Sequence, residues 1–215
     1  MCGNKTIYNI SYKVTWIIFR HSRVIGTGTL VRRGSEEPVP MIPYDSGKTT
    51  LFRLILNFIQ PDSGEVTFYG NGFNHAADKS MRKNVVFVPQ GNTLISGTIR
   101  NNLLMAKPDA SDEELHTALH TSCADFVFDL PQGIDTVLSE HGGGLSEGQA
   151  QRIAIARGLL RPGAVFLLDE ISSALDEDTE RELFSRLFAA RPSTTILLIT
   201  HRKKVAALCD ERLEI

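Results

Sequence analysis

The apolar positions of this chain follow two alternating patterns, which predict buried strands and amphipathic helices. Continuous apolar runs at Ala164–Leu168 and Thr194–Thr200 are typical of strands that are buried on both faces. Elsewhere apolar residues recur every three or four positions, as on the buried face of a helix. These predicted helices are Leu51–Ile59, one with Ile153, Ala156 and Leu160, and one with Leu183, Phe184, Leu187 and Phe188. Further strands are expected at Lys5–Val14, Glu65–Tyr69 and Asn84–Val88. Strands that alternate with helices predict an α/β fold with a mostly parallel sheet.

The more polar stretch in the middle of the chain predicts a helical insertion. Within residues 91–160, the sequences Ser111-x-x-Glu114 and Ser146-x-x-Gln149 are capping boxes, which open helices. We therefore expect a single domain over residues 1–215, with a core at about 1–90 and 161–215 and a helical subdomain at about 91–160.

Charge and cysteine content narrow the classes of function. The net charge of -2 argues against a nucleic-acid partner, because such proteins usually carry a basic field. The short basic run Arg202–Lys204 is interpreted as a solvated helix face. Three separated cysteines, an odd number without a CxxC pair, indicate neither a disulfide framework nor a zinc site and fit a reducing cytoplasm. No apolar run approaches the roughly 20 residues that cross a bilayer, so any membrane-spanning part is expected outside these residues.

A candidate phosphate loop precedes the first predicted helix. Ser46, Gly47, Lys48, Thr49 and Thr50 open the helix Leu51–Ile59. In a phosphate loop, backbone N–H groups hold phosphate, a lysine reaches the β- and γ-phosphates, and a Ser or Thr hydroxyl binds Mg²⁺. Lys48 and Thr49 occupy those positions, but the full pattern requires glycine at position 42, where this chain has isoleucine.

Two consecutive acids follow the apolar run Ala164–Leu168. A parallel sheet binds ligands at the carboxyl ends of its strands, and Asp169 and Glu170 are placed at that edge. Asp169 is expected to hold Mg²⁺ through water, and Glu170 to accept a proton from an attacking water molecule.

Five motifs in order resemble those of the ABC transporter ATPases. Leu145-Ser146-Glu147-Gly148-Gln149 resembles the signature motif, whose helix N-terminus with its dipole is an anion site. The others are the phosphate loop, the Q-loop glutamine at Gln90, the D-loop at Ser173–Asp176 and the switch histidine at His201. Ile95–Arg100 and Gly142–Gly144 are similar to the exporter branch of the family. The resemblance covers about residue 44 to the C-terminus.

The resemblance implies a P-loop NTPase core with an inserted helical subdomain, and ATP hydrolysis coupled to transport. The cofactors it implies are ATP and Mg²⁺. Its partners would be a second nucleotide-binding domain, paired head to tail, and a transmembrane domain, at the cytoplasmic face of the cell membrane. Implied catalytic residues are Glu170, His201 and Gln90, and implied magnesium ligands are Thr49, Gln90 and Asp169. Nucleotide contacts would come from Ser46, Gly47, Lys48, Thr49, Thr50 and Asp176, and Leu145, Ser146, Glu147, Gly148 and Gln149 would complete the partner domain's site.

Residues 15–45 depart from the family pattern. They show no periodicity, and Ile42, Tyr44 and Asp45 stand where the family has Gly, usually Ser, and Gly. A frameshift or deletion scar, a degenerate nucleotide site and an unusual insertion each account for this. The rival function is therefore a degenerate ABC domain that binds nucleotide weakly and acts as a regulatory or structural module. A soluble ABC ATPase of DNA repair or translation is a third option, against which the exporter-like Ile95–Arg100 stretch counts.

Overall fold

The protein divides into two compact units in a computed structural model of the chain. One unit contains Met1–Ile18, Ser22–Arg82 and Glu211–Ile215, and the other contains Phe19–His21 and Lys83–Asp210. The structure describes residues 10–15, 27–32, 48–60, 66–70, 73–139, 143–192 and 194–209. Each unit is described by itself below.

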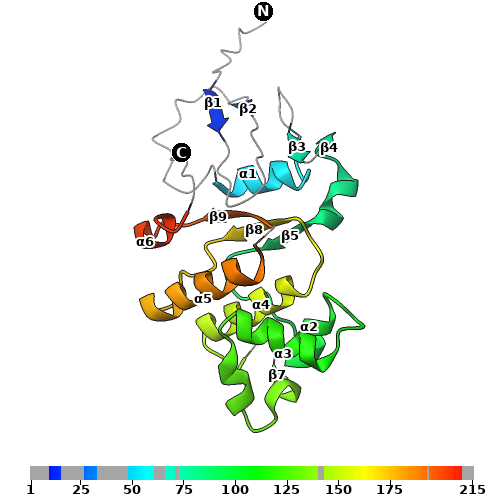
Figure 1. Ribbon diagram of the computed structural model, residues 1–215, viewed down its shortest axis with the longest axis vertical. Helices are drawn as coiled ribbons and strands as arrows, with labels where there is room; N and C mark the ends of the chain where they lie inside the picture. The colour runs from blue at the N-terminus through cyan, green and yellow to red at the C-terminus, as the bar shows by residue number, and fades with distance from the viewer. Residues whose placement is uncertain are drawn as a thin grey trace, which may run out of the picture. The chain divides into compact units, whose positions relative to one another are not determined.

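The first unit carries two antiparallel strand pairs and one helix (Figure 1). Strand β1 (Ile10–Thr15) pairs with β2 (Thr27–Arg32), and β3 (Thr67–Gly70) pairs with β4 (Phe73–Ala76). Helix α1 (Lys48–Ile55) lies between these pairs in the sequence, and the 3₁₀ helix η1 (Lys79–Asn84) follows β4. Strands β1 and β3 overlap the expected strands Lys5–Val14 and Glu65–Tyr69, although residues 5–9 and 65 lie outside the described part.

Helix α1 ends earlier than the apolar pattern predicts, because Asn57 adopts a left-handed conformation. Asn57 has a φ of 54°. Its N–H donates to the carbonyl of Leu54, and the N–H of Phe58 donates to that of Arg53, which is a Schellman motif with asparagine at its left-handed position. The prediction that the helix extends to Ile59 is therefore wrong, and Phe58 and Ile59 are exposed.

The guanidinium of Arg82 stabilises the same helix end. Its Nε donates to the carbonyl of Leu56 over 2.7 Å, and its Nη2 donates to that of Asn57 over 2.7 Å. These carbonyls have no partner within the helix, so a cation that binds them also complements the helix dipole.

A parallel sheet of three strands forms the centre of the second unit. Strand β8 (Val165–Asp169) lies between β5 (Val85–Val88) and β9 (Thr195–Ile199), and both pairings are parallel. All five residues of β8 are buried. The predicted α/β fold with a mostly parallel sheet is thus confirmed, and the three strands coincide with the expected apolar runs to within a residue at each end.

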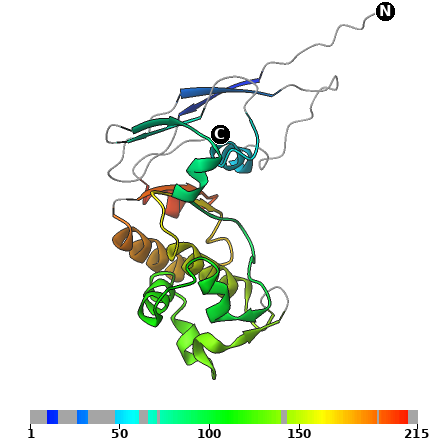
Figure 2. The ribbon, with the colours of Figure 1, turned by 90° about the vertical axis from the view of Figure 1, so that its right-hand side faces the viewer.

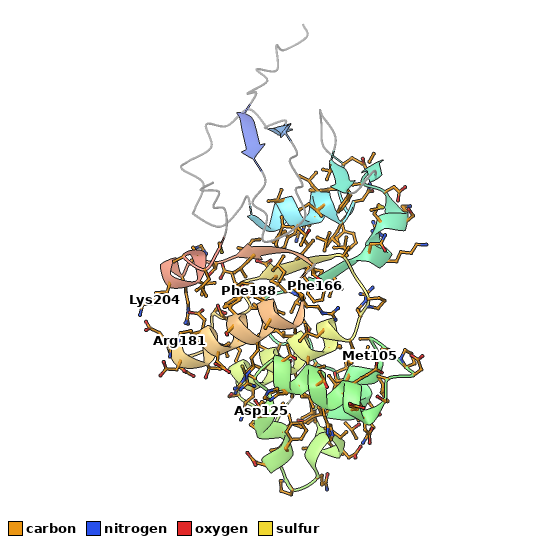
Figure 3. All side chains as sticks on the ribbon, in the orientation of Figure 1. Met105, Asp125, Phe166, Arg181, Phe188 and Lys204 are labelled. Atoms are coloured by element: carbon orange, nitrogen blue, oxygen red, sulfur yellow. The ribbon has the colours of Figure 1, made fainter. Side chains whose placement is uncertain are left out.

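Helices α4 (Glu147–Leu159) and α5 (Glu177–Ala190) cover the same face of this sheet. Gly158 of α4 lies so close to β5 that an added Cβ would be 2.9 Å from Val88 Cγ2. Arg191, just after α5, lies over the ring of Phe166 on β8, at 5.4 Å from its centroid. Because Val88 pairs with Leu168, two residues beyond Phe166, the side chains of Val88 and Phe166 point to one face of the sheet. Figure 3 labels Phe166 on β8 and Phe188 on α5.

The segment between β5 and α4 consists of short helices and one small strand pair (Figure 2). Its elements are β6 (Gly97–Thr98), α2 (Ile99–Leu104), α3 (Asp112–Thr121), η2 (Asp125–Asp129), η3 (Gly133–Asp135) and β7 (Val137–Leu138). The two predicted capping boxes are confirmed, with Ser111 before α3 and Ser146 before α4. The last described element is α6 (Lys203–Ala206). Among the described residues, none of the helices has the length and apolar content needed to cross a membrane.

The close packing of α4 on β5 predicts a large penalty for a branched side chain at position 158. Gly158→Val would force Val86 and Val88 to move, so it should lower the free energy of unfolding by about 1–3 kcal/mol. Urea unfolding followed by circular dichroism measures this loss. The control is Ala189→Val on the exposed face of α5, and an equal loss in both variants would contradict the packing argument.

Candidate functional site

Three polar side chains follow the carboxyl ends of the three parallel strands. Gln90 lies two residues after β5, Glu170 comes directly after β8, and His201 lies two residues after β9. The register aligns these ends, because Val88 pairs with Leu168 and Asp169 pairs with Ile199. Ligands of parallel sheets bind at this edge.

The carboxylate of Glu170 joins the other two side chains. Gln90 Nε2 donates to Glu170 Oε2 over 3.3 Å, and His201 Nε2 lies 2.6 Å from Glu170 Oε1. The Glu170 side chain is 15% exposed, whereas that of His201 is 44% exposed. The structure therefore brings together the three residues predicted as catalytic, with one oxygen of a mostly buried carboxylate against each neighbour.

The backbone of Glu170 is held in an unfavourable conformation. Its φ of 47° lies in the left-handed region, which costs a residue with a Cβ about 1–2 kcal/mol. Its N–H donates to the carbonyl of Ile199, and its carbonyl accepts from the N–H of Ser173. These bonds fix the turn that follows β8, and strained backbone of this kind is concentrated at functional sites.

Asp169 and Gln90 offer the kind of ligand that Mg²⁺ requires. Asp169 is the last residue of β8 and is 7% exposed. Carboxylate and amide oxygens are hard donors, and protein sites for Mg²⁺ use one or two carboxylates together with water and substrate phosphates. The donor set at this edge therefore fits the ion. Thr49, the third predicted ligand, belongs to α1 in the other unit, and only its backbone is described.

The remaining residues of the candidate phosphate loop contribute no described side chain. Ser46 and Gly47, like Ile42, Tyr44 and Asp45, lie outside the described residues. Lys48, Thr49 and Thr50 form the first turn of α1. Their assignment to the phosphates stays a prediction.

The segment Leu145–Gln149 opens helix α4 through a complete capping box. Gln149 N–H donates to Ser146 Oγ over 3.2 Å, and Ser146 N–H donates to Gln149 Oε1 over 2.9 Å. The first-turn N–H groups of Glu147 and Gly148 have no acceptor among the described residues, and both Ser146 and Glu147 are exposed. A helix end with free amides can bind an anion.

Gly148 is required for a contact within the chain as well. An added Cβ at this position would lie 2.7 Å from the carbonyl oxygen of Ala174 and 3.1 Å from Leu175 Cδ2. The signature segment is therefore packed directly on the turn Ser173–Asp176. The sequence pattern assigned Gly148 only to the partner domain's nucleotide site.

Asp176, predicted to contact nucleotide, caps helix α5. Its carboxylate accepts hydrogen bonds from the N–H groups of Thr179 over 2.9 Å and Asp178 over 3.1 Å. The bond from the Thr179 N–H is the main reason that the pKa of Asp176 lies below its ordinary value. The side chain thus has a structural partner at the helix N-terminus, which is a preferred position for aspartate.

Arg202 contradicts the interpretation of the basic run as a solvated face. Its Nη2 donates to the carbonyls of Ser173 over 3.0 Å and Leu175 over 2.8 Å. Its Nη1 lies 3.4 Å from Oε2 of Glu180, whose side chain is 5% exposed. Sequence analysis missed this pair, because its partners lie more than 20 residues away in the chain. Arg202 directly follows His201, so its hydrogen bonds connect the segment after β9 to the turn Ser173–Asp176.

This chain belongs to the ABC transporter family. The family described as "ABC transporter" matches residues 45–173, which is more than half of the chain. The matched range contains the Gln90 segment, the Leu145–Gln149 helix start and the Asp169–Glu170 strand end described above.

Its relatives are of the exporter type. An "ATP-dependent lipid A-core flippase" of Haemophilus influenzae is 40% identical over 172 residues, which are 79% of this chain and 29% of that protein. A "mitochondrial potassium channel ATP-binding subunit" of Mus musculus is 40% identical over 158 residues, covering 73% of this chain and 22% of that protein. The solved structure of a bacterial Atm1-family ABC exporter with ATP bound superposes with a TM-score of 0.71 at 36% identity, over 78% of this chain and 30% of that one. The chain spans between 20% and 30% of the length of its curated relatives. It is therefore an ABC transporter ATP-binding domain of the exporter type.

The contact between Gly148 and Ala174 predicts that position 148 contributes to stability without any nucleotide. Gly148→Ala should destabilise the nucleotide-free protein by about 1–3 kcal/mol, because a backbone oxygen lies where the methyl group would be. Thermal unfolding compares it with Glu147→Ala, a change at an exposed neighbour. Unchanged stability in Gly148→Ala would leave phosphate approach as the reason for this glycine.

Proposed function

We propose that this chain binds and hydrolyses ATP between two such domains and thereby powers a membrane-spanning transport partner at the cytoplasmic face of the membrane. The observation that carries the proposal is the position of the Glu170 carboxylate, between Gln90 and His201 at the carboxyl edge of a parallel sheet. Membership of the ABC transporter family supports it. The transported substrate would be selected by the membrane partner.

In this proposal Glu170 is the general base. Its carboxylate accepts a proton from the attacking water, while Gln90 and His201 hold the two carboxylate oxygens in place. A positioned base of this kind contributes about 10²–10⁴-fold to a rate. Lys48 and His201 hold phosphate oxygens, and Asp169, Thr49 and Gln90 would hold Mg²⁺, which supplies positive charge against the phosphates when bound.

The signature segment would complete the site of a second domain. Ser146 and Glu147, at the start of α4, are exposed, whereas Gly148 is buried against Ala174. A phosphate bound by a second domain would accept from the first-turn N–H groups of this helix, so that ATP joins two domains head to tail. Asp176 belongs to the turn Ser173–Asp176, on which Gly148 packs, so it would lie near the phosphate bound by the second domain.

Removal of the proposed base should stop turnover without preventing binding. We expect Glu170→Gln to reduce ATP turnover by about 10²–10⁴-fold, to leave ATP binding intact and to accumulate an ATP-bound dimer. Phosphate release measures the rate, and gel filtration with ATP measures the dimer. Glu177→Gln, at an exposed glutamate of α5, is the matched control. Turnover near the unmodified level in Glu170→Gln would exclude Glu170 as the base.

The altered phosphate loop is proposed to weaken ATP binding. Isoleucine at position 42 disfavours any φ above zero, which glycine adopts freely, and Asp45 places a negative charge near a polyphosphate. At about 4 Å this repulsion lies between roughly 1 and 4 kcal/mol, depending on the local dielectric. Since about 1.4 kcal/mol changes affinity tenfold, the double change Ile42→Gly and Asp45→Gly should tighten ATP binding at least about tenfold.

Calorimetric titration of ATP into both forms measures that gain, which should shrink as salt screens the charge. Asp45→Asn separates the charge from the backbone effect. Micromolar binding by the unmodified chain, or no gain on repair, would contradict the proposed weakness. Failure to bind or hydrolyse ATP after repair would instead favour the regulatory or structural role that Ile42 and Asp45 suggest.

A further inference from the structure

Two side chains of helix α4 hold the segment Pro89–Thr93, which contains Gln90, at both of its ends. Gln151 Nε2 donates to the carbonyl of Pro89 over 3.2 Å. Arg157 Nη1 donates to the carbonyl of Thr93 over 3.1 Å, and its Nη2 donates to Thr93 Oγ1 over 2.6 Å. These bonds join residues that are more than 60 positions apart in the chain. One helix therefore sets the position of the whole segment.

The Gln151 contact is maintained despite an unsatisfied polar atom. Gln151 is 3% exposed, and its Oε1 has no hydrogen-bond partner within the part of the chain that the structure describes. The amide cannot turn over to relieve this, because Oε1 would then face the carbonyl oxygen of Pro89 instead of a donor. A buried acceptor without a partner is unfavourable. We therefore interpret the hydrogen bond from Gln151 Nε2 to the Pro89 carbonyl as the reason that a glutamine stands at this buried position.

The Arg157 contact is equally specific. Its guanidinium is partly buried, and this burial lowers its pKa. The described acceptors of its Nη atoms are both on Thr93, a neutral residue. Loss of the Thr93 oxygens would leave a partly buried cation with poorer solvation, so the helix and the segment are strongly linked at this end.

Gln90 is sensitive to small movements of that segment. Its hydrogen bond to Glu170 is 3.3 Å long and exposed, close to the distance beyond which such a contact no longer counts as a hydrogen bond. Gly91, the next residue, has a φ of 81°, so the chain turns sharply just after Gln90. A shift of a few tenths of an ångström in Pro89 or Thr93 is enough to make or break the Gln90–Glu170 contact.

We propose that Gln151 and Arg157 are positioning residues, which transmit the position of the signature end of α4 to Gln90. Helix α4 follows its N-cap Ser146 without a break to Leu159, so it joins the signature end directly to Gln151 and Arg157. Binding of a second domain's nucleotide at Ser146–Gln149 would then change the distance between Gln90 and Glu170. This inference rests on the proposed function, which supplies the nucleotide at Ser146–Gln149 and the reacting nucleotide at Gln90 and Glu170. The hydrogen bonds from α4 to Pro89 and Thr93 do not depend on that function.

The first experiment needs no nucleotide. Hydrogen exchange of the Leu94 amide, which donates to Asn92 Oδ1 within this segment, is measured in the unmodified chain and in Arg157→Gln, Arg157→Lys and Gln151→Leu. We expect exchange to rise about tenfold to a hundredfold in Arg157→Gln, less in Arg157→Lys, and to rise in Gln151→Leu, while the amides of α5 stay unchanged. Arg161→Gln, at an exposed arginine just after α4, is the matched control. Thr93→Val, which removes one acceptor, replaces any variant that fails to fold.

The second experiment separates positioning from structure. With Mg²⁺ and ATP, we expect Arg157→Gln and Gln151→Leu to lower kcat about tenfold or more with little change in KM, and Arg157→Lys to restore part of the loss. Unchanged exchange at Leu94, or raised exchange with unchanged kcat, would overturn the inference. Absence of turnover in the unmodified chain would overturn the proposed function instead, and the exchange result would still decide whether α4 holds the Gln90 segment.

Discussion

The complete burial of strand β8 between two parallel neighbours is the constraint on which the rest of the second unit depends. Each backbone group of β8 must find its partner in β5 or β9, so the register of all three strands is fixed. That register places Gln90, Glu170 and His201 at one edge, although 80 residues separate the first two. It also presents Val86 and Val88 to Gly158, which positions α4. Assembly of the site is thus a consequence of how the core strands pair.

The sequence predicts most of this arrangement because the relevant signals are local. Continuous apolar runs located β8 and β9, and two capping boxes located the starts of α3 and α4. The order of motifs indicated the family before any geometry was available. The signals that failed are those that depend on distant partners. The end of α1 is set by the left-handed conformation of Asn57 and by Arg82, 25 residues further on. Arg202 has the composition of a surface residue, but it binds carbonyls of a turn that only the fold brings near it.

Helix α4 connects functions that the sequence presents as separate. Its first turn carries the signature segment, and Gly148 in that turn packs on Ala174 of the D-loop. Its second and third turns bind the carbonyls of Pro89 and Thr93. The glycines and buried side chains of α4 therefore carry structural requirements of their own. A substitution of Gly148, Gln151 or Arg157 changes a contact within the chain, so its effect on turnover cannot be assigned to nucleotide contact alone.

The departures at residues 42–45 affect only one of the two contributions that this chain would make to the proposed dimer, namely its phosphate loop. In a head-to-tail pair, each ATP is held by the phosphate loop of one domain and by the signature segment of the other. A pair of identical chains would place the altered loop in both sites, and both would bind weakly. A pair with a different domain whose loop is intact would contain one site built from that loop and from Ser146–Gln149 of this chain. The capping box and the Gly148 packing are both formed in this chain, so under the proposed function its signature segment would be available to that site. The altered loop is therefore least costly to function when the partner domain is a different chain.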